Sequence, residues 1–339
     1  MGKFTVIWQS KTPSQFEWIN ELFGPFISDH VFDGEHEVVL DNAILIDAFI
    51  NRYDEGYYRK FAGKNAFLVH ALDETYRGGY ERYLNFKGVF RDHYSSKFNR
   101  LRVFDIPNGY RTKRPSTSPA KSALERPYIW SMVGEMNKST RPEVLSALLP
   151  HSPFFILGTG SIYLPGDSKR PKAVLDTEKY YEVMENSVFS PAPMGNVNIG
   201  SYRMYEALEA GSIPIVEKRF FLDYYKSILG QHPIPTIASW SDAAALMDSL
   251  LKRPDRLVSL QNECTEFWSD FKIRIRRDIE EFILANSRGA ARGRMYSPLI
   301  NMRFFSYVEL LKHHSVGAIF RRIKRQYDRL RSQGRWRVS

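Results

Sequence analysis

Apolar runs of strand length alternate with helical patterns along most of this chain. The run Phe4–Trp8 is followed by a helical pattern over residues 13–22, and the same order recurs as far as residue 285. Such alternation is typical of parallel sheets covered by helices, because two parallel strands need a long return connection between them. The sequence therefore predicts an α/β fold with parallel strands.

The predicted elements cover two regions. Strands are predicted over residues 4–8, 37–40, 43–46, 66–70, 102–106, 128–133, 154–157, 187–190, 213–216 and 235–238. Helices are predicted over residues 13–22, 76–86, 141–149, 177–185, 202–210, 220–228, 241–251 and 254–285. A stretch rich in Pro, Ser, Lys and Arg at 113–126 predicts a linker. It would join an N-terminal domain (1–112) to a second domain (127–287), with C-terminal helices at 288–339. A length of 339 residues, 43% of them hydrophobic, is enough for two separate cores.

Several classes of protein are excluded by their missing patterns. No stretch approaches about 18 consecutive apolar residues, so we expect no membrane-spanning helix. The first eight residues are strand-like, and we expect no secretory signal. Cys264 is the single cysteine, which excludes an intramolecular disulfide. The sequence has neither a Walker A loop nor a His-Glu-x-x-His pattern, and we expect no metal site and no cofactor.

The positive charge is concentrated near the C-terminus. The net charge is +10, and eight basic residues and one acidic residue lie between Arg321 and Arg337. Apolar residues at helical spacing run through the same region, which predicts a basic amphipathic helix from Gly317 to Ser339. Such a helix suits an anionic membrane surface. Nucleic acid is the alternative partner, and a solvated or partly disordered end is the third interpretation.

The segment 187–216 reads as strand, glycine-bearing loop, helix, glycine turn and strand. A helix start offers unpaired N–H groups and a partial positive charge, so a phosphate there would also meet Ser201 and Arg203. Glu206 lies on the same helix face as Arg203, and its carboxylate suits a diol such as a ribose. The segment therefore indicates a nucleotide-linked substrate. The alternative is an ordinary buried unit in which Arg203 and Glu206 pair with each other or with neighbours.

A second group of candidate ligands opens the helix predicted at 141–149. Lys138 and Arg141 follow the first strand of the second domain, where open α/β sheets bind ligands. Both could contact a diphosphate. The alternative is a capped helix with solvated charges.

The first domain offers candidates for a general base and for acceptor contacts. His70, Asp73 and Glu74 follow a strong strand, where a base could face a cleft between the domains. The alternative is a buried histidine with two carboxylates that cap the helix predicted from Tyr76. Further candidates for the acceptor side of the same cleft are Arg91, Asn108 and Tyr110.

The segments 126–141 and 187–216 resemble the signature of exostosin-type glycosyltransferases. That signature has a strand with Pro, then Ser-x-Arg (Ser201 to Arg203), then Glu-Ala (Glu206) and a Pro-Val strand; the resemblance covers about 126–238. It implies a GT-B fold, in which two Rossmann-like domains face a central cleft. By the same resemblance Arg203 and Arg141 hold the donor diphosphate, Glu206 holds the ribose, transfer inverts the anomeric centre, and no metal is needed.

Together these features favour one expectation. The chain would transfer a sugar from a nucleotide sugar, most simply a UDP-sugar, to a glycan or lipid-linked glycan in bacterial surface polysaccharide synthesis. It would work in the cytoplasm, on the inner face of the membrane. Two alternatives stay open: a basic nucleic-acid-binding protein, disfavoured because the charge is terminal, and a catalytically silent GT-B partner subunit.

Overall fold

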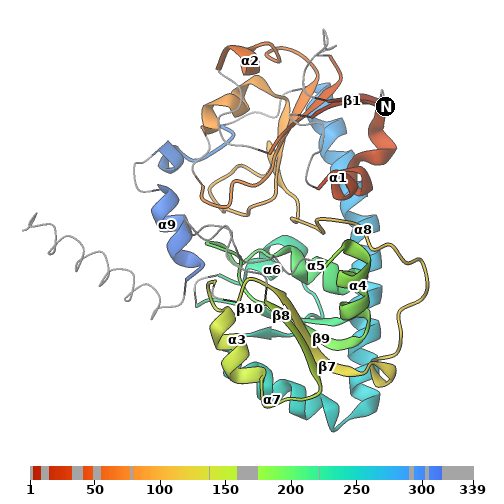
Figure 1. Ribbon diagram of the computed structural model, residues 1–339. Helices are drawn as coiled ribbons and strands as arrows, with labels where there is room; N and C mark the ends of the chain where they lie inside the picture. Colours follow the sequence, from red (N-terminus) through yellow and green to blue (C-terminus); the bar gives the residue numbers. More distant parts are fainter. Residues whose placement is uncertain are drawn as a thin grey trace, which may run out of the picture.

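The chain folds around two parallel sheets, one above the other in Figure 1. The computed structural model describes residues 3–8, 15–32, 41–48, 55–76, 79–136, 138–158, 175–220, 222–289, 294–301 and 305–314. The predicted strand at 37–40 and the predicted basic helix from Gly317 to Ser339 lie outside these residues.

The first sheet has the strand order β2-β1-β3-β4-β5-β6, and all its neighbours pair in parallel. Its strands are β1 (Phe4–Trp8), β2 (Ile27–Phe32), β3 (Ala43–Asp47), β4 (Ala66–His70), β5 (Gly88–Arg91) and β6 (Val103–Asp105). Every residue of β3 and β4 is buried. Continuous apolar runs of this kind form strands whose two faces are both covered.

The second sheet has the order β11-β10-β9-β7-β8, again with parallel pairs. Its strands are β7 (Tyr128–Gly134), β8 (Phe154–Gly158), β9 (Ser187–Ala192), β10 (Ile213–Glu217) and β11 (Thr236–Ile237). Although β8 follows β7 in the chain, β9 pairs with the other side of β7. The end of β7 therefore lies beside the loop that leaves β9.

The helices cover both sheets (Figure 1). They are α1 (Phe16–Phe23), α2 (Glu55–Arg59), α3 (Arg141–Leu148), α4 (Thr177–Glu185), α5 (Tyr202–Glu209), α6 (Tyr224–Leu229), α7 (Trp240–Leu251), α8 (Pro254–Arg288) and α9 (Phe305–Lys312). Most begin within a residue or two of the sequence prediction. Helix α7 starts at a capping box made by Ser239 and Asp242, a local signal that the sequence alone carries.

Helix α8 joins the two halves of the molecule. It runs along both sheets in Figure 1, and it contacts β5 in the first half and β10 in the second. Its buried stripe includes Trp268, which stacks on Trp18 with ring centroids 5.6 Å apart, and Phe282, whose ring lies 5.0 Å from that of Phe90. Trp18 and Phe90 both belong to the first half, so α8 holds the halves together through aromatic contacts.

Several elements differ between the sequence prediction and the structure. The helix predicted over 76–86 is wrong: a 3₁₀-helix spans Tyr80–Asn85, and Tyr76 has a left-handed φ of 53°. The adjacent Gly78 and Gly79 disfavour a continuous α-helix there. Strands β2 and β5 were not predicted, because β2 alternates with polar residues and β5 has only four residues.

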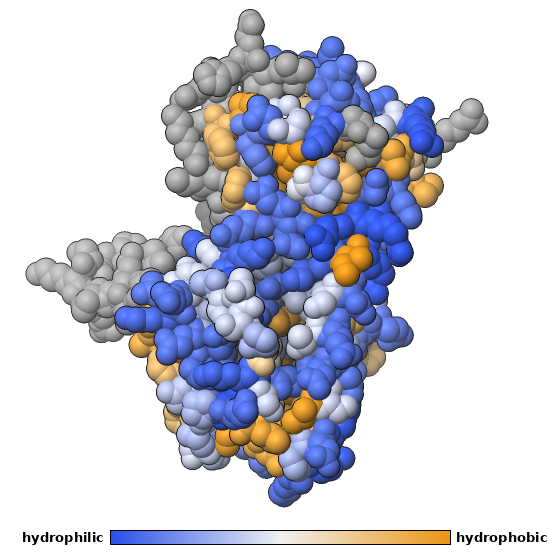
Figure 2. Space-filling view, turned by 90° about the vertical axis from the view of Figure 1, so that its right-hand side faces the viewer, coloured by the Kyte–Doolittle hydropathy of each residue, from blue (hydrophilic) through white to orange (hydrophobic). Residues whose placement is uncertain are grey.

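The segment predicted as a linker is anchored at its C-terminal end. Ala123–Glu125 forms a 3₁₀-helix with a capping box at Ser122. The buried guanidinium of Arg126 donates hydrogen bonds to the carbonyls of Ser187 and Ala210, at 2.9 and 3.2 Å. This segment lies on the face of the molecule shown in Figure 2. On this face, hydrophilic residues predominate where the two halves meet. The division into domains at 112 and 127 stays a prediction.

Candidate functional site

A cavity of about 560 Å³ opens where the end of β7 meets the start of α5. Four of the five residues predicted to bind a donor line it: Arg141, Ser201, Arg203 and Glu206. The other lining residues are Arg111, Thr112, Gly134, Leu175, Thr177, Tyr180 and Tyr202. The fifth predicted residue, Lys138, does not line the cavity; its ammonium pairs with the Glu135 carboxylate at 2.6 Å. We call this space the donor cavity.

Two guanidinium groups meet above Gly134. One nitrogen of Arg203 donates to the carbonyl of Val133, and Arg141 Nη1 donates to the carbonyl of Glu135 at 2.6 Å. A Cβ added to Gly134 would lie 3.0 Å from Arg203 Nη2 and 3.4 Å from Arg141 Nη1. The two cations therefore lie side by side against a backbone that has no side chain.

This pair of cations is electrostatically strained without an anion. Burial, and next the neighbouring Arg203, lower the pKa of Arg141 to about 10. Arg141 Nε is buried and finds no hydrogen-bond partner among the described residues. A buried donor without a hydrogen-bond partner is unfavourable, and so is a second positive charge beside it. A ligand that brings an acceptor atom and a negative charge removes both costs. A diphosphate would supply both the charge and the acceptor oxygens.

The first turn of α5 faces the same cavity. Ser201 is its N-cap residue, and the Ser201 side chain makes no capping hydrogen bond. Gly200 allows a close approach here, because an added Cβ would lie 2.7 Å from the hydroxyl of Tyr224. The backbone donors at the helix start and the Ser201 hydroxyl are therefore available to an anion.

Glu206 forms the far wall of the cavity. The Tyr180 hydroxyl donates to one carboxylate oxygen at 2.7 Å, and the Arg111 backbone N–H donates to the other at 3.3 Å. Burial raises the pKa of Glu206 despite these hydrogen bonds. Glu206 and Arg203 therefore pair with neighbours, as the alternative interpretation expected, and the charge of Arg203 lowers the pKa of Glu206. Each carboxylate oxygen can still accept a further hydrogen bond.

Sequence reasoning missed the cavity residues outside α3 and α5. Tyr180 comes from α4, and Arg111 and Thr112 come from the connection between the sheets. Arg111 and Thr112 follow the Asn108-Gly109 turn, but nothing in that turn indicates a donor site. No local pattern would have identified these three residues, because only the packing of α4 and of the connection against α5 brings them to the cavity.

Three of the residues expected to face a cleft are instead buried inside the first half. His70 ends β4 and is the register partner of Arg91, which ends β5. His70 Nδ1 lies 2.5 Å from the Tyr83 hydroxyl, and Arg91 pairs with Asp73 at 3.3 Å. His70, Asp73 and Arg91 are 1% exposed or less, so the expectation that they face substrate is wrong for this arrangement. Burial, and then Arg82 and Arg91, lower the pKa of His70 well below its usual range.

Asn108 and Tyr110 are also buried, although both were expected on the acceptor side. Tyr110 packs edge-on against Trp18, with ring centroids 5.2 Å apart. Asn108 Oδ1 accepts a hydrogen bond from the Tyr224 hydroxyl of the second half at 3.3 Å. These two side chains therefore join elements of the fold instead of forming an open surface.

Glu74 is the one candidate base whose side chain is partly exposed. It follows β4 and lies near the donor cavity: burial raises the pKa of Tyr202, and Asp92 and Glu74 raise it further. Tyr202 lines the donor cavity at the start of α5. The charge of Glu74 thus acts on a residue at the start of α5. No helix begins at Tyr76, so the proposed capping role of Asp73 and Glu74 is wrong.

Metal sites and membrane-spanning helices are both absent from the part of the chain that the structure describes. No group of three or more His, Cys, Asp or Glu side chains is arranged there to hold a metal ion. No described helix combines the length and the apolar character that crossing a membrane requires.

One protein family matches this chain. The family described as the RXYLT1 C-terminal domain matches residues 110–285, which is more than half of the chain. The chain belongs to this family. It groups with exostosin-like glycosyltransferase relatives, so the expected resemblance holds at that broader level. No curated protein sequence matches the chain.

Solved glycosyltransferase structures share the fold. A DNA-modifying β-glucosyltransferase aligns with a TM-score of 0.51 and 10% identity, over 83% of this chain and 99% of that one. T4 phage BGT in complex with UDP-glucose aligns with a TM-score of 0.50 at 10% identity and the same coverage. Anabaena HepE in complex with UDP-glucose scores 0.47 at 11% identity, over 83% of this chain and 99% of that one. The fold is GT-B, as expected, and by family and fold this member is a glycosyltransferase.

A substitution at Gly134 should weaken nucleotide binding in the donor cavity and leave the rest of the fold unchanged. Gly134→Ala would push the two guanidinium groups apart, at a backbone φ of +135° that favours glycine. We expect UDP affinity to fall about tenfold, which corresponds to about 1.4 kcal/mol. Isothermal calorimetry measures this. Gly24→Ala, where an added Cβ meets no atom within 4 Å, is the control and should bind UDP like the parent. Equal affinities for both variants would refute the geometry.

Proposed function

We propose that this family member transfers a sugar from a UDP-sugar to a glycan or lipid-linked glycan acceptor, with inversion and without a metal. The observation that carries the proposal is the pair of half-buried guanidiniums over Gly134, at the start of α5, with Arg141 Nε buried and unpaired among the described residues. The choice of UDP is supported by the UDP-glucose bound to T4 phage BGT, whose fold is shared.

The chemistry of sugar transfer explains why these groups suit the reaction. Negative charge builds on the departing diphosphate while the sugar passes through an oxocarbenium-like state. Arg141, Arg203 and the N–H groups of α5 would stabilise that charge from fixed positions. Glu206 would accept hydrogen bonds from the ribose hydroxyls.

Inversion requires a base opposite the leaving group. Glu74 is our proposal, because it follows β4 in the first half, its charge acts on Tyr202 at the start of α5, and its side chain is partly exposed. It would remove the proton of the acceptor hydroxyl as that oxygen bonds to the anomeric carbon and the bond to the diphosphate breaks. His70 and Asp73 are too deeply buried to reach an acceptor without rearrangement.

A donor screen tests the proposed function. Thermal unfolding is followed with UDP, GDP, CDP and their common sugar conjugates, each at millimolar concentration. A nucleotide that binds the native state at 100 times its Kd stabilises it by about 2.7 kcal/mol. We expect UDP to raise the unfolding midpoint and the other nucleotides to do so less. If no nucleotide shifts the midpoint, the donor site is refuted; a shift without transfer to any glycan favours the silent partner.

Glu206 should make binding depend on the ribose hydroxyls. We expect the protein to bind UDP roughly tenfold more tightly than 2′-deoxy-UDP, because a hydrogen bond to a charged group contributes about 1.5–3 kcal/mol. In Glu206→Ala this preference should disappear while binding to the diphosphate remains. Calorimetry with both nucleotides on both proteins gives the coupling. A preference that survives in the variant contradicts the assignment.

The basic tail is proposed to hold the protein on the cytoplasmic face of a bacterial membrane, where surface polysaccharides are made. Deleting residues 317–339 should lower binding to vesicles with 30% anionic lipid by about tenfold or more, since each basic residue near such a surface contributes about 1 kcal/mol. Transfer to a soluble acceptor should persist. Neutral phosphatidylcholine vesicles are the control. Unchanged vesicle binding, or tighter binding of the tail to duplex DNA than to vesicles, would overturn the membrane role.

A further inference from the structure

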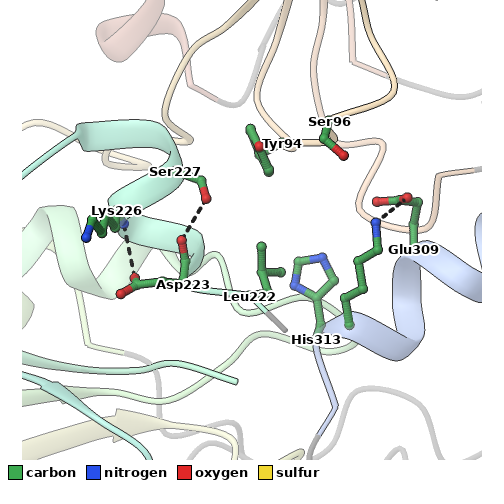
Figure 3. A pocket seen from close by; sticks show the side chains of 9 residues that line it. Tyr94, Ser96, Leu222, Asp223, Lys226, Ser227, Glu309 and His313 are labelled. Atoms are coloured by element: carbon green, nitrogen blue, oxygen red, sulfur yellow. Dashed lines mark hydrogen bonds and ion pairs between the residues drawn. The ribbon is translucent and has the colours of Figure 1, made fainter. Parts of the chain in front are cut away.

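A second cavity, of about 370 Å³, lies between the two halves and shares no lining residue with the donor cavity (Figure 3). Three segments far apart in the sequence form it. Tyr94 and Ser96 come from the loop after β5, Asp223 and its neighbours from the start of α6, and Glu309 to His313 from the end of α9. We call it the α9 cavity.

The α9 cavity is held in shape by buried hydrogen bonds. His313 Nδ1 accepts the backbone N–H of Ile199 at 3.1 Å, and its carbonyl accepts Arg219 Nε at 3.1 Å. His313 Nε2 lies 3.0 Å from the Tyr76 hydroxyl, which donates to the carbonyl of Tyr94 at 2.9 Å. Elements of both halves and α9 thus meet at one imidazole. A site built this way needs little ordering when a ligand binds.

One short turn contacts both cavities. Ile199 binds His313 at the α9 cavity, and Ser201, two residues later, lines the donor cavity. Tyr225 braces the turn, because its hydroxyl receives the N–H of Ser201 at 3.2 Å and donates to the carbonyl of Ile199 at 3.2 Å. A molecule in the α9 cavity would therefore lie next to the reaction site without entering it.

The lining combines charges of both signs. Glu309 is 3% exposed; one carboxylate oxygen accepts from Lys312 at 2.7 Å, and the other faces the cavity in Figure 3. Lys226 is exposed, and its ammonium makes no hydrogen bond among the described residues. Asp223 caps α6, and the hydroxyls of Tyr94 and Ser96 complete the polar lining.

Charges of both signs in the lining favour an uncharged ligand with many hydroxyl groups. Two lysines and two carboxylates line the cavity, so an ion of either sign would meet a like charge. A sugar hydroxyl both donates and accepts: it can donate to a carboxylate and accept from an ammonium. The cavity volume falls in the range of about 300–1,000 Å³ that is typical of small-molecule sites.

We propose that the α9 cavity binds an uncharged sugar unit of the acceptor glycan, away from the hydroxyl that receives the transferred sugar. The proposal rests on the proposed glycosyltransferase function and adds a second carbohydrate subsite to it. That subsite would hold a growing glycan by a part that does not react, and so would favour acceptors longer than one sugar.

Saturation-transfer NMR with the full chain tests the subsite. The probes are glucose, galactose, mannose, xylose, N-acetylglucosamine and maltose, each with and without saturating UDP. We expect at least one probe to bind, with a signal that UDP does not remove. Ser96→Trp, at an exposed lining position, should weaken that binding at least tenfold by filling the cavity. Ser118→Trp, exposed and outside both cavities, is the matched control and should bind as the parent does.

Each outcome separates the subsite from the donor site, because UDP stabilisation is measured on the same samples. If no probe binds, if UDP displaces the bound probe, or if Ser96→Trp binds it unchanged, the subsite is refuted. If a probe binds the α9 cavity while UDP never stabilises the protein, the proposed donor function fails and the cavity stands. Glu309→Gln, which keeps the side-chain size, should weaken the probe about tenfold and gives a second check should Ser96→Trp fold poorly.

Discussion

Arg203→Ala is expected to reduce sugar transfer roughly 100- to 1,000-fold, the usual consequence of removing one group that stabilises developing negative charge. The loss should fall on both donor binding and turnover. Arg203 reaches the donor cavity from the first turn of α5 and lies beside Arg141. Without it, the departing diphosphate would lose one of the two guanidiniums that lie over Gly134.

The same substitution should not destabilise the protein without ligand. The neighbouring cation lowers the pKa of Arg141, so removing Arg203 relieves a repulsion even though its hydrogen bond to Val133 is lost. We therefore expect the unfolding midpoint without nucleotide to be equal to or above that of the parent, while the UDP-induced shift disappears. Sites that bind ligands commonly show this opposition between stability and function.

A matched control distinguishes this effect from a general loss of positive charge. Arg277→Ala removes an exposed guanidinium on α8, 66% exposed and 3.8 Å from Asp278. It should leave UDP binding, transfer and the unfolding midpoint unchanged. An Arg203→Ala variant that keeps its UDP-induced shift, or that unfolds well below the parent without ligand, would contradict the role of Arg203.

Glu74→Gln is expected to lower turnover by roughly 10²- to 10⁴-fold, the usual contribution of a general base. Donor binding should be unaffected, because Glu74 does not line the donor cavity. The pH dependence of the rate distinguishes a general base from a residue with another role. In the parent, the rate should rise with pH as the base loses its proton, and this limb should be absent in the variant. Steady-state rates between pH 5 and 9 measure it.

Two variants make the test of Glu74 sharper. Glu74→Asp keeps a carboxylate and should recover part of the turnover together with the pH-dependent limb. Glu280→Gln, at an exposed position on α8, removes a carboxylate far from the cavity and should behave like the parent. Activity of Glu74→Gln within tenfold of the parent would exclude Glu74 as the base.

The local pattern around α5 was predictable from sequence because its signals are short-range. The helix over Tyr202–Glu209, the glycine before it and the shared face of Arg203 and Glu206 all follow from residue spacing. The meeting of Arg203 with Arg141 does not. It depends on β9 pairing with β7, although β8 lies between them in the chain. The packing of the whole sheet sets the strand order, and no short sequence pattern specifies it.

The first half shows the converse error. His70 and Asp73 were correctly placed at and just after the end of a parallel strand, where ligands often bind; Arg91 ends β5, a strand that was not predicted. Whether such side chains face solvent or a core depends on what covers them. Tyr80, Phe98 and Phe305 pack over this region, and the guanidinium of Arg91 lies 4.2 Å from the centre of the Phe98 ring. Phe305 comes from the other end of the chain, so only the tertiary structure could bury these charges.

The sequence by itself therefore determined the fold class, most of the strands and helices, and the chemical character of the donor residues. Hydrophobic period, capping residues and glycine turns act over a few residues, and they can be read in order. The tertiary structure decided which of the charged residues meet in a cavity and which are buried in a core. It brought Tyr180 and Arg111 to Glu206 and enclosed the α9 cavity with a helix near the C-terminus. Contacts of this kind join residues far apart in the chain, and packing of the whole molecule selects them.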